Sequence, residues 1–271
     1  ARAFYENGYA ACHPGEPLMT STIFPDLKGK SVYITGGASG IGAALTDGFM
    51  AQGAKVAIIG RSAADDFIAE METKHGATPL FMQGDISDIP RLRETIQQAV
   101  GEHGGLDVLV NNAANDQRHT LDEVDEEFYD WMQAVNQKAY FFACQEAARQ
   151  MDGSGSIINF SSISYIMGNA GYPIYTSANA AITGMTRSLA RELGPKGIRV
   201  NALAPGWVLT QKQLDMWADP DALAAHMERQ CLKEHLTPED MIDPTLYLAS
   251  NASRMMTGQC MAVDGGVVVS G

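Results

Sequence analysis

Short apolar runs alternate with longer segments of helical periodicity from Lys30 onward. The runs "SVYIT", "KVAII", "PLFMQG", "DVLVN", "SIINF", "IRVNAL" and "CMAVDG" are apolar at most positions. This pattern is typical of strands that are buried on both faces of a sheet. Helical segments such as "ALTDGFMAQG" and "IPRLRETIQQAVGEHG" separate the runs, and helical crossovers require the strands to pair in parallel. The sequence therefore predicts an α/β fold with one doubly wound parallel sheet and helices on both faces.

Glycine and proline mark several of the predicted helix ends. Gly53, Gly76 and Gly104 follow helical segments, as a left-handed C-terminal cap prefers. Pro90 fits the first turn of a helix. Neither a repeat nor a low-complexity tract interrupts the pattern after residue 30. We therefore expect a single domain over residues 25–271, preceded by an N-terminal extension over residues 1–24.

The composition excludes several classes of protein. The chain has 271 residues, 45% of them hydrophobic, and a formal charge of −13; such an acidic surface argues against nucleic-acid binding. It lacks an apolar run of about 18 residues, so no membrane span is expected. Four scattered cysteines show no metal-ligand spacing, and we expect no metal site and reduced thiols. The N-terminal stretch resembles no export signal, so we expect a cytoplasmic protein.

A glycine-rich turn lies between the first predicted strand and the first helix. It reads "TGGASGIG" at residues 35–42. Glycines let the backbone approach a pyrophosphate closely, and the following helix directs its N-terminal amides at the negative charge. With a strand before it and a helix after it, the turn predicts a Rossmann-type dinucleotide site.

The motifs along the chain resemble those of the short-chain dehydrogenase/reductase family. After the TGxxxGxG loop come "GDI" at 84–86, "NNAA" at 111–114, "SS" before "YTSA", "PGWVLT" at 205–210 and "VDGG" at 263–266. The resemblance covers residues 28–266, with Ala114 where glycine is commoner. It implies that a nicotinamide dinucleotide contacts these residues: Gly36, Ser39, Gly40, Ile41, Gly42, Arg61, Asp85, Ile86, Asn112, Ala113, Ala114, Tyr175, Asn179, Pro205, Gly206, Val208 and Thr210.

The end of the second predicted strand bears on the choice between NAD and NADP. NAD enzymes place an acidic residue there to bind the ribose 2′-hydroxyl, whereas a basic residue accommodates the 2′-phosphate. Gly60 and Arg61 occupy this point of the sequence. They favour NADP, and NAD remains the alternative.

The family resemblance also implies an acid/base site. Ser162 and Tyr175 lie thirteen residues apart, which is the spacing at which the family sets a serine hydroxyl and a tyrosine phenol around one substrate oxygen. Tyr175 would exchange the proton, Ser162 would orient the oxygen, and Asn136 would hold a water on the proton route. Ser161 is expected to be structural.

Asn179 departs from the family pattern at this site. The family places a lysine four residues after the tyrosine, on the same face of the helix, where its charge lowers the phenol pKa from about 10. Asparagine can donate a hydrogen bond but carries no charge. Either a working enzyme has lost its lysine and is crippled, or the chain binds a dinucleotide with little or no catalysis. If another cation takes over the role of the missing lysine, Lys138, Arg118 and His119 are the first candidates.

The loop after the fourth predicted strand carries the substrate prediction. "NDQRH" at 115–119 is rich in donors and acceptors and suits a polyhydroxylated substrate. Together with "FPDLKGK", "LARELGP" and "QCLK", it resembles bacterial pentose and hexose dehydrogenases of the family, which oxidise an aldose to a lactone. A 3-oxoacyl or ketone reductase is the alternative. The expected substrate contacts are Asn115, Asp116, Arg118, His119, Ser162, Ser164 and Trp207.

Two further expectations concern the lid and the assembly. Residues 207–235 are expected to form a lid over the substrate, in which Trp207 either stacks on a sugar or packs against neighbouring side chains.

The helices around 141–151 and 175–193 carry apolar residues on more than one face. In the resembling family the corresponding helices pair across subunits, so the chain is expected to form a homotetramer.

Overall fold

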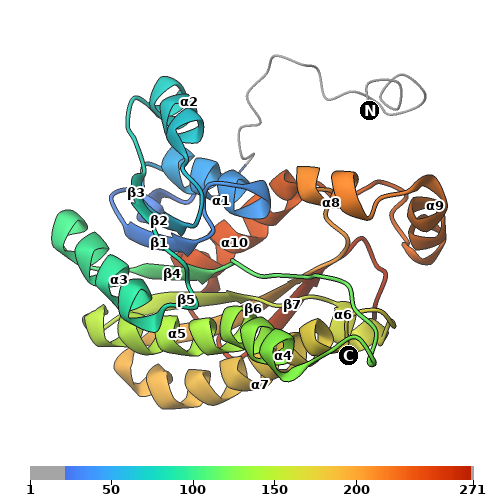
Figure 1. Ribbon diagram of the computed structural model, residues 1–271. Helices are drawn as coiled ribbons and strands as arrows, with labels where there is room; N and C mark the ends of the chain where they lie inside the picture. Colours follow the sequence, from blue (N-terminus) through green and yellow to red (C-terminus); the bar gives the residue numbers. More distant parts are fainter. Residues whose placement is uncertain (1–21, 270–271) are drawn as a thin grey trace.

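A parallel sheet forms the centre of the molecule in the computed structural model, which describes residues 22–269 (Figure 1). Its strand order is β3-β2-β1-β4-β5-β6-β7, and every neighbouring pair is parallel. The predicted doubly wound sheet is thereby confirmed. The strands are β1 Ser31–Thr35, β2 Lys55–Gly60, β3 Leu80–Gln83, β4 Val108–Asn111, β5 Gly155–Phe160, β6 Ile198–Pro205 and β7 Cys260–Val263.

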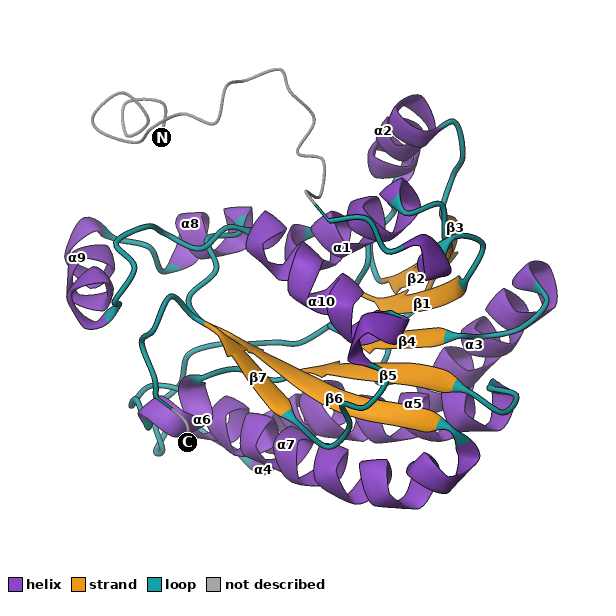
Figure 2. Cartoon of the chain, turned by 180° about the vertical axis from the view of Figure 1, so that it is seen from behind, coloured by secondary structure: helices purple, strands orange, loops and turns teal. Residues whose placement is uncertain are grey.

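Helices cover both faces of this sheet (Figure 2). In chain order they are α1 Gly40–Ala51, α2 Asp65–His75, α3 Ile89–His103, α4 Glu126–Gln133, α5 Ala139–Gln150, α6 Ser164–Met167, α7 Pro173–Leu193, α8 Gln211–Met216, α9 Pro220–Arg229 and α10 Ile242–Ala249. Between α4 and α5 lies a π-helical turn, Ala134–Lys138.

Alternate residues of each strand face two separate cores. In β1, Tyr33 packs with the core between the sheet and α3, α5 and α7. Its neighbours Val32 and Ile34 pack with the core beneath α1 and α10. Because successive side chains of a strand point to opposite faces, a run that is apolar at every position supplies both cores.

Capping residues set the predicted ends of α2 and α3. Gly76 and Gly104 adopt left-handed conformations, with φ of 68° and 84°, directly after these helices. Asp88 caps the start of α3, where its side chain accepts a hydrogen bond from the Arg91 amide at 3.1 Å. Pro90 lies in the first turn of α3, as its lack of an N–H allows.

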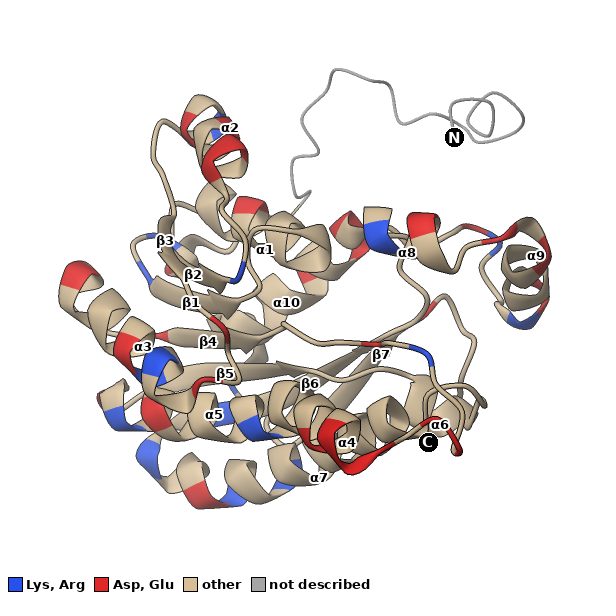
Figure 3. Cartoon of the chain, in the orientation of Figure 1, with Lys and Arg blue, Asp and Glu red and all other residues tan. Residues whose placement is uncertain are grey.

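Charged residues lie mainly on the helices and loops and scarcely occur in the strands (Figure 3). Lys55 and Arg199 are the charged residues of the seven strands. In the described range, 22–269, no helix has the length and apolar character that crossing a bilayer would require. Nearly all of the expected N-terminal extension lies outside this range.

Candidate active site

A cavity of about 1030 Å³ opens at the carboxyl ends of the strands. This is the edge at which open α/β sheets bind ligands. The glycine-rich turn, the ends of β2, β4, β5 and β6, the start of α7 and the segment with α8 and α9 all contribute to its wall. With the exception of Gly42 and His119, every residue predicted to contact cofactor or substrate lines this cavity.

The turn after β1 adopts a conformation that requires glycine. Gly36 and Gly40 have φ of 68° and 52°, in the left-handed region. Gly42 lies beneath the turn, where a Cβ would overlap the carbonyl oxygen of Gly36 and approach Asn112 Nδ2 at 2.8 Å. The absence of side chains leaves a cradle at the N-terminus of α1, and this cradle fits a dinucleotide pyrophosphate.

Asn112, directly after the neighbouring strand β4, holds this turn in place. Its backbone N–H donates to Thr35 Oγ1 at 2.9 Å, and its side-chain Nδ2 donates to the Thr35 carbonyl at 3.0 Å. The Ala113 N–H also donates to Thr35 Oγ1, at 3.0 Å. Asn112 therefore cross-links the ends of β1 and β4 at the rim of the cavity.

The far end of the cavity is formed by the ends of β2 and β3. Gly60 and Arg61 line it, together with Asp85 and Ile86. Both the Ser87 hydroxyl and the Ser87 amide donate to Asp85 Oδ1, at 2.7 and 2.8 Å. Arg61 is exposed, so its guanidinium is accessible to a bound anion.

Ser162 and Tyr175 reach the middle of the cavity from different elements. Ser162 follows β5, and Tyr175 lies in the first turn of α7. The Ser162 hydroxyl oxygen accepts a hydrogen bond from the Ser164 amide at 3.1 Å, which orients it. The buried hydroxyl of Ser161 donates to the Asn179 carbonyl at 3.0 Å.

Asn179 lies one turn after Tyr175 and is only 3% exposed. Its side-chain Nδ2 donates to the backbone carbonyl of Tyr175 at 2.9 Å. The amide is therefore folded onto its own helix, and it brings a dipole but no charge to the position where the family places a lysine.

The surroundings of Tyr175 oppose ionisation of its phenol. Burial raises the pKa to about 12, and the nearby Asp116 carboxylate also acts to raise it, whereas Ser162 and Asn179 lower it in part. A phenol with this pKa holds its proton at neutral pH, so little tyrosinate is available to act as a general base.

Asn136 lies in the π-helical turn and is bonded to the substrate loop. Its Oδ1 accepts from the Asn115 amide at 2.7 Å, and its Nδ2 donates to the Asn115 carbonyl at 3.0 Å. These two bonds fix the backbone of the loop at the point where it enters the cavity. Its place in the cavity wall is compatible with the predicted water-holding role.

His119 points away from the cavity, although it was predicted to contact the substrate. The ring is 6% exposed and meets Phe128 edge-on at 5.1 Å. Its Nε2 lies 3.3 Å from the Ile174 N–H, in the first turn of α7, and its Nδ1 lies 3.0 Å from the Gln117 carbonyl. Because Ile174 N–H can only donate, Nε2 is the acceptor. His119 therefore caps the helix that carries Tyr175.

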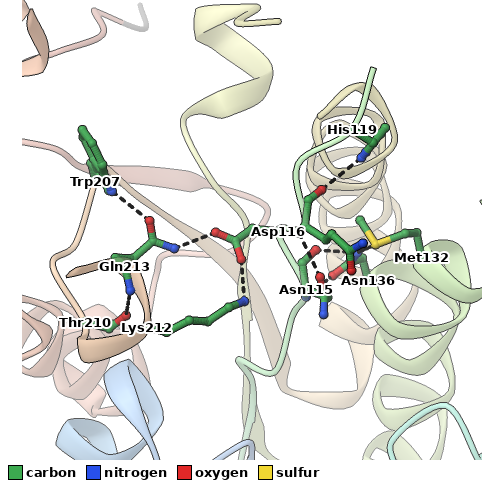
Figure 4. Close-up of polar contacts among 10 residues, drawn as sticks. Asn115, Asp116, His119, Met132, Asn136, Trp207, Thr210, Lys212 and Gln213 are labelled. Atoms are coloured by element: carbon green, nitrogen blue, oxygen red, sulfur yellow. Dashed lines mark hydrogen bonds and ion pairs between the residues drawn. The ribbon is translucent and has the colours of Figure 1, made fainter. Parts of the chain in front are cut away.

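Asp116 joins the substrate loop to α8 (Figure 4). Lys212 Nζ donates to Asp116 Oδ1 and Gln213 Nε2 donates to Asp116 Oδ2, each at 2.6 Å. Gln213 Oε1 in turn accepts from Trp207 Nε1 at 2.8 Å. Burial opposes the Asp116 charge, but Lys212 and Gln213 hold the pKa of this carboxyl below its usual value. Sequence reasoning missed Lys212 and Gln213; the polar "TQKQ" after "PGWVL" was the available signal.

Arg118 is stacked against aromatic rings. Its guanidinium carbon lies 4.0 Å from the Tyr172 ring centre and 5.4 Å from that of Trp217. The Tyr172 and Tyr175 ring centres are 5.8 Å apart. Trp207 packs edge-on against His226 at 5.4 Å. Lys138, the other candidate for a substitute cation, is exposed and does not line this cavity.

Comparisons with known proteins agree with this arrangement. A family model described as enoyl-(acyl carrier protein) reductase matches residues 36–268. The chain is 44% identical over 254 residues to a protein named probable galactose dehydrogenase from Rhizobium meliloti, with 92% of this chain and 99% of that protein covered. It is 42% identical over 250 residues to a D-xylose 1-dehydrogenase from Caulobacter vibrioides, with the same coverage.

A solved structure extends the likeness to the fold. The short-chain dehydrogenase from Burkholderia cenocepacia in complex with NADP matches with a TM-score of 0.83 and 32% identity, over 89% of this chain and 99% of that chain. The chain therefore belongs to the short-chain dehydrogenase/reductase family. It is an oxidoreductase by family, and its relatives include bacterial sugar dehydrogenases.

Proposed function

We propose that this protein is an NADP-preferring oxidoreductase that oxidises an aldose or related sugar to a lactone or keto sugar. One observation carries the proposal. Ser162, Tyr175 and the polar loop of Asn115, Asp116 and Arg118 share a single cavity with the glycine-rich turn. A hydroxyl-rich substrate bound there would lie between the acid/base pair and the dinucleotide.

The residues divide the work of the reaction. A nicotinamide dinucleotide bound along the glycine-rich turn would supply the hydride acceptor. Tyr175 takes the hydroxyl proton, and Ser162 donates a hydrogen bond to the same oxygen and orients it. Asn115, Asp116 and Arg118 hydrogen-bond the remaining hydroxyls, and Asn136 keeps the loop in place.

The preference for NADP rests on Gly60 and Arg61 at the end of β2. Gly60 offers no carboxylate to bind a ribose 2′-hydroxyl, and the exposed Arg61 supplies a cation for a 2′-phosphate. Comparing kcat/KM for the two cofactors in the protein and in Arg61→Ala tests this preference. The variant should lose most of its activity with NADP and little with NAD; an equal loss with both would contradict it.

A substrate panel tests the reaction itself. NADP and NAD reduction would be measured with aldoses, deoxy sugars and sugar acids, and oxidation of the reduced cofactors with 3-oxoacyl thioesters. The proposal is supported if aldoses are turned over and the deoxy sugars, which lack individual hydroxyls, are turned over more slowly. Activity confined to thioesters would overturn it in favour of the reductase suggested by the name of the family model.

A second candidate, a dinucleotide-binding protein with little catalysis, is favoured by Asn179 alone. Burial raises the pKa of the Tyr175 phenol to about 12, and the uncharged Asn179 amide offsets this rise only in part. Calorimetric binding of NADPH without turnover of any panel member, even in alkaline buffer, would support this candidate. Ordinary turnover at pH 7 would exclude it.

We further propose a cytoplasmic homotetramer. A groove on the outer side of the molecule is lined by Phe141 and Phe142 of α5 and by Ala181, Met185 and Leu189 of α7. Phe141 is 44% exposed. Burial of this apolar surface between copies of the chain would stabilise the assembly. Light scattering tests it, and a monomeric mass at micromolar concentration would contradict it.

A further inference from the structure

The acid/base site lacks a positive charge on the helix of its tyrosine and has a negative charge nearby. Asn179 is neutral, and Asp116 opposes ionisation of Tyr175. We infer that Lys212, on the lid helix α8, acts in place of the missing lysine by binding Asp116 and offsetting part of the negative charge that this carboxylate brings to the Tyr175 site. This inference rests on the proposed role of Tyr175 in proton transfer.

Both oxygens of Asp116 are bound by consecutive residues of α8. Lys212 takes Oδ1 and Gln213 takes Oδ2, each at 2.6 Å (Figure 4). The Asp116 side chain is 20% exposed and that of Lys212 is 48% exposed. A charged partner at this distance offsets part of the field that a partly buried carboxylate exerts on its neighbours.

The ammonium can occupy this place only while α8 is seated on the substrate loop. Thr210 caps the start of α8, where its Oγ1 accepts from the Gln213 amide at 3.3 Å. Trp207 holds the Gln213 side chain from the preceding turn. Lys212 and Asp116 are 96 residues apart in the sequence, so displacement of the lid separates them and leaves the carboxylate charge uncompensated.

Other titratable and charged groups face the same part of the cavity without replacing Lys212. Tyr140 of α5 and Tyr172 before α7 lie near Tyr175, and Arg118 is stacked on Tyr172. His226 and Arg229 of α9 also line the wall, and Arg229 contacts Asn169 at 3.5 Å. Throughout residues 22–269, Lys212 is the cation that forms an ion pair with Asp116.

The consequence for the chemistry is a proton transfer linked to the lid. During oxidation the substrate O–H bond would break and its proton would bond to the tyrosinate oxygen, while the electron pair of the C–H bond would pass as hydride to a bound nicotinamide. Forming the tyrosinate beforehand is easier when Lys212 compensates Asp116. Tyr175 therefore becomes a better base when the lid is seated over the substrate, and it retains its proton when the lid is displaced.

A phenol titration tests this inference without any substrate. The Asn179→Lys background is used because its added charge lowers the titration range of Tyr175. The tyrosinate absorbance of each protein is measured against its Tyr175→Phe counterpart, which removes the contribution of the other tyrosines. Lys212→Met should raise the midpoint by about one pH unit, a tenfold loss of tyrosinate at a fixed pH below it.

Two further variants separate the ion pair from other effects. Lys196→Met removes an exposed lysine from the short 3₁₀ turn that follows α7 and should leave the midpoint unchanged. In an Asp116→Asn background, Lys212 loses its anchor, so Lys212→Met should cause little further shift. A purely structural role of Lys212 in the lid would raise KM for substrates and leave the titration unchanged.

Two results would overturn the inference. One is an equal shift, or no shift, from Lys212→Met and Lys196→Met. The other is a shift from Lys212→Met that is as large in the Asp116→Asn background as it is with Asp116 intact. Because the titration requires no turnover, its result does not depend on whether any sugar of the panel is oxidised.

Discussion

The two ends of the cavity are built in different ways. At the dinucleotide end, the shape comes from backbone conformation and from the absence of side chains, as at Gly36 and Gly42. At the proton-transfer end, the properties come from charges on side chains of separate segments, as in the pair of Asp116 and Lys212. A glycine turn either fits a pyrophosphate or excludes it, whereas the basicity of a phenol can be adjusted continuously. Substitutions in the glycine turn should therefore abolish cofactor binding. Substitutions around Tyr175 should instead change its basicity in proportion to the charge that they add or remove.

The largest effect is expected at the dinucleotide end. Gly42→Val should lower kcat/KM for the cofactor more than about a thousandfold, since the added side chain overlaps the Gly36 carbonyl and pushes on Asn112, at a cost of about 4 kcal/mol or more. Steady-state kinetics and calorimetric titration with NADPH would measure the loss. Near-normal binding would show that this end is less rigid than its geometry indicates.

A gain is expected at the proton-transfer end. Asn179→Lys should raise turnover at neutral pH by about two orders of magnitude, because one charge near the phenol contributes roughly 3 kcal/mol. Adding Tyr175→Phe should abolish the gain, since no phenol remains to respond. Unchanged turnover would contradict the account in which Asn179 stands in place of a lysine that tunes Tyr175.

The pH profile should distinguish the two directions of reaction. The pKa of Tyr175 is raised to about 12, so the tyrosinate fraction increases about tenfold per pH unit below that value. Oxidation, which needs tyrosinate, should therefore rise through neutral and alkaline pH without a plateau. Reduction, which needs the protonated phenol, should stay flat. A plateau of the oxidation rate near neutral pH would contradict the raised pKa.

A smaller effect is expected at His119, which links the substrate loop to the catalytic helix. His119→Phe keeps the ring packing but leaves the Ile174 amide without its acceptor, which costs about 1–3 kcal/mol of folding free energy. Urea denaturation would measure the change. His119→Gln retains an acceptor and should recover part of the loss; equal stability of all three proteins would refute the capping role.

The smallest effect provides a matched control for the glycine turn. In α3, a Cβ added at Gly101 meets nothing within 4 Å, so Gly101→Ala should stabilise the protein by about 0.5–1 kcal/mol through helix propensity. Thermal unfolding would detect the increase, and cofactor binding should not change. A loss of NADPH affinity in this variant would mean that the sensitivity to glycine replacement is not local to the turn.

The same division explains what could be predicted from the sequence. The strands, the helix caps at Gly76 and Gly104 and the glycine turn are encoded by local patterns, and the structure reproduces them. His119 was misplaced because composition alone does not reveal the direction in which a loop side chain points. Lys212 was missed because its partner Asp116 lies 96 residues away, and no local pattern encodes an ion pair between a loop and a distant helix.

Helix α7 also has a mechanical consequence. It contains 21 residues, so it is about 31 Å long at 1.5 Å per residue. Tyr175 lies in its first turn, and Ala181, Met185 and Leu189 line the outer groove along its middle. A helix of this length is stiff, so a displacement of its middle at the groove also moves its first turn, which carries the Tyr175 phenol. Any protein that packs on the outer groove therefore contacts the same helix, α7, that positions the proton-transfer group.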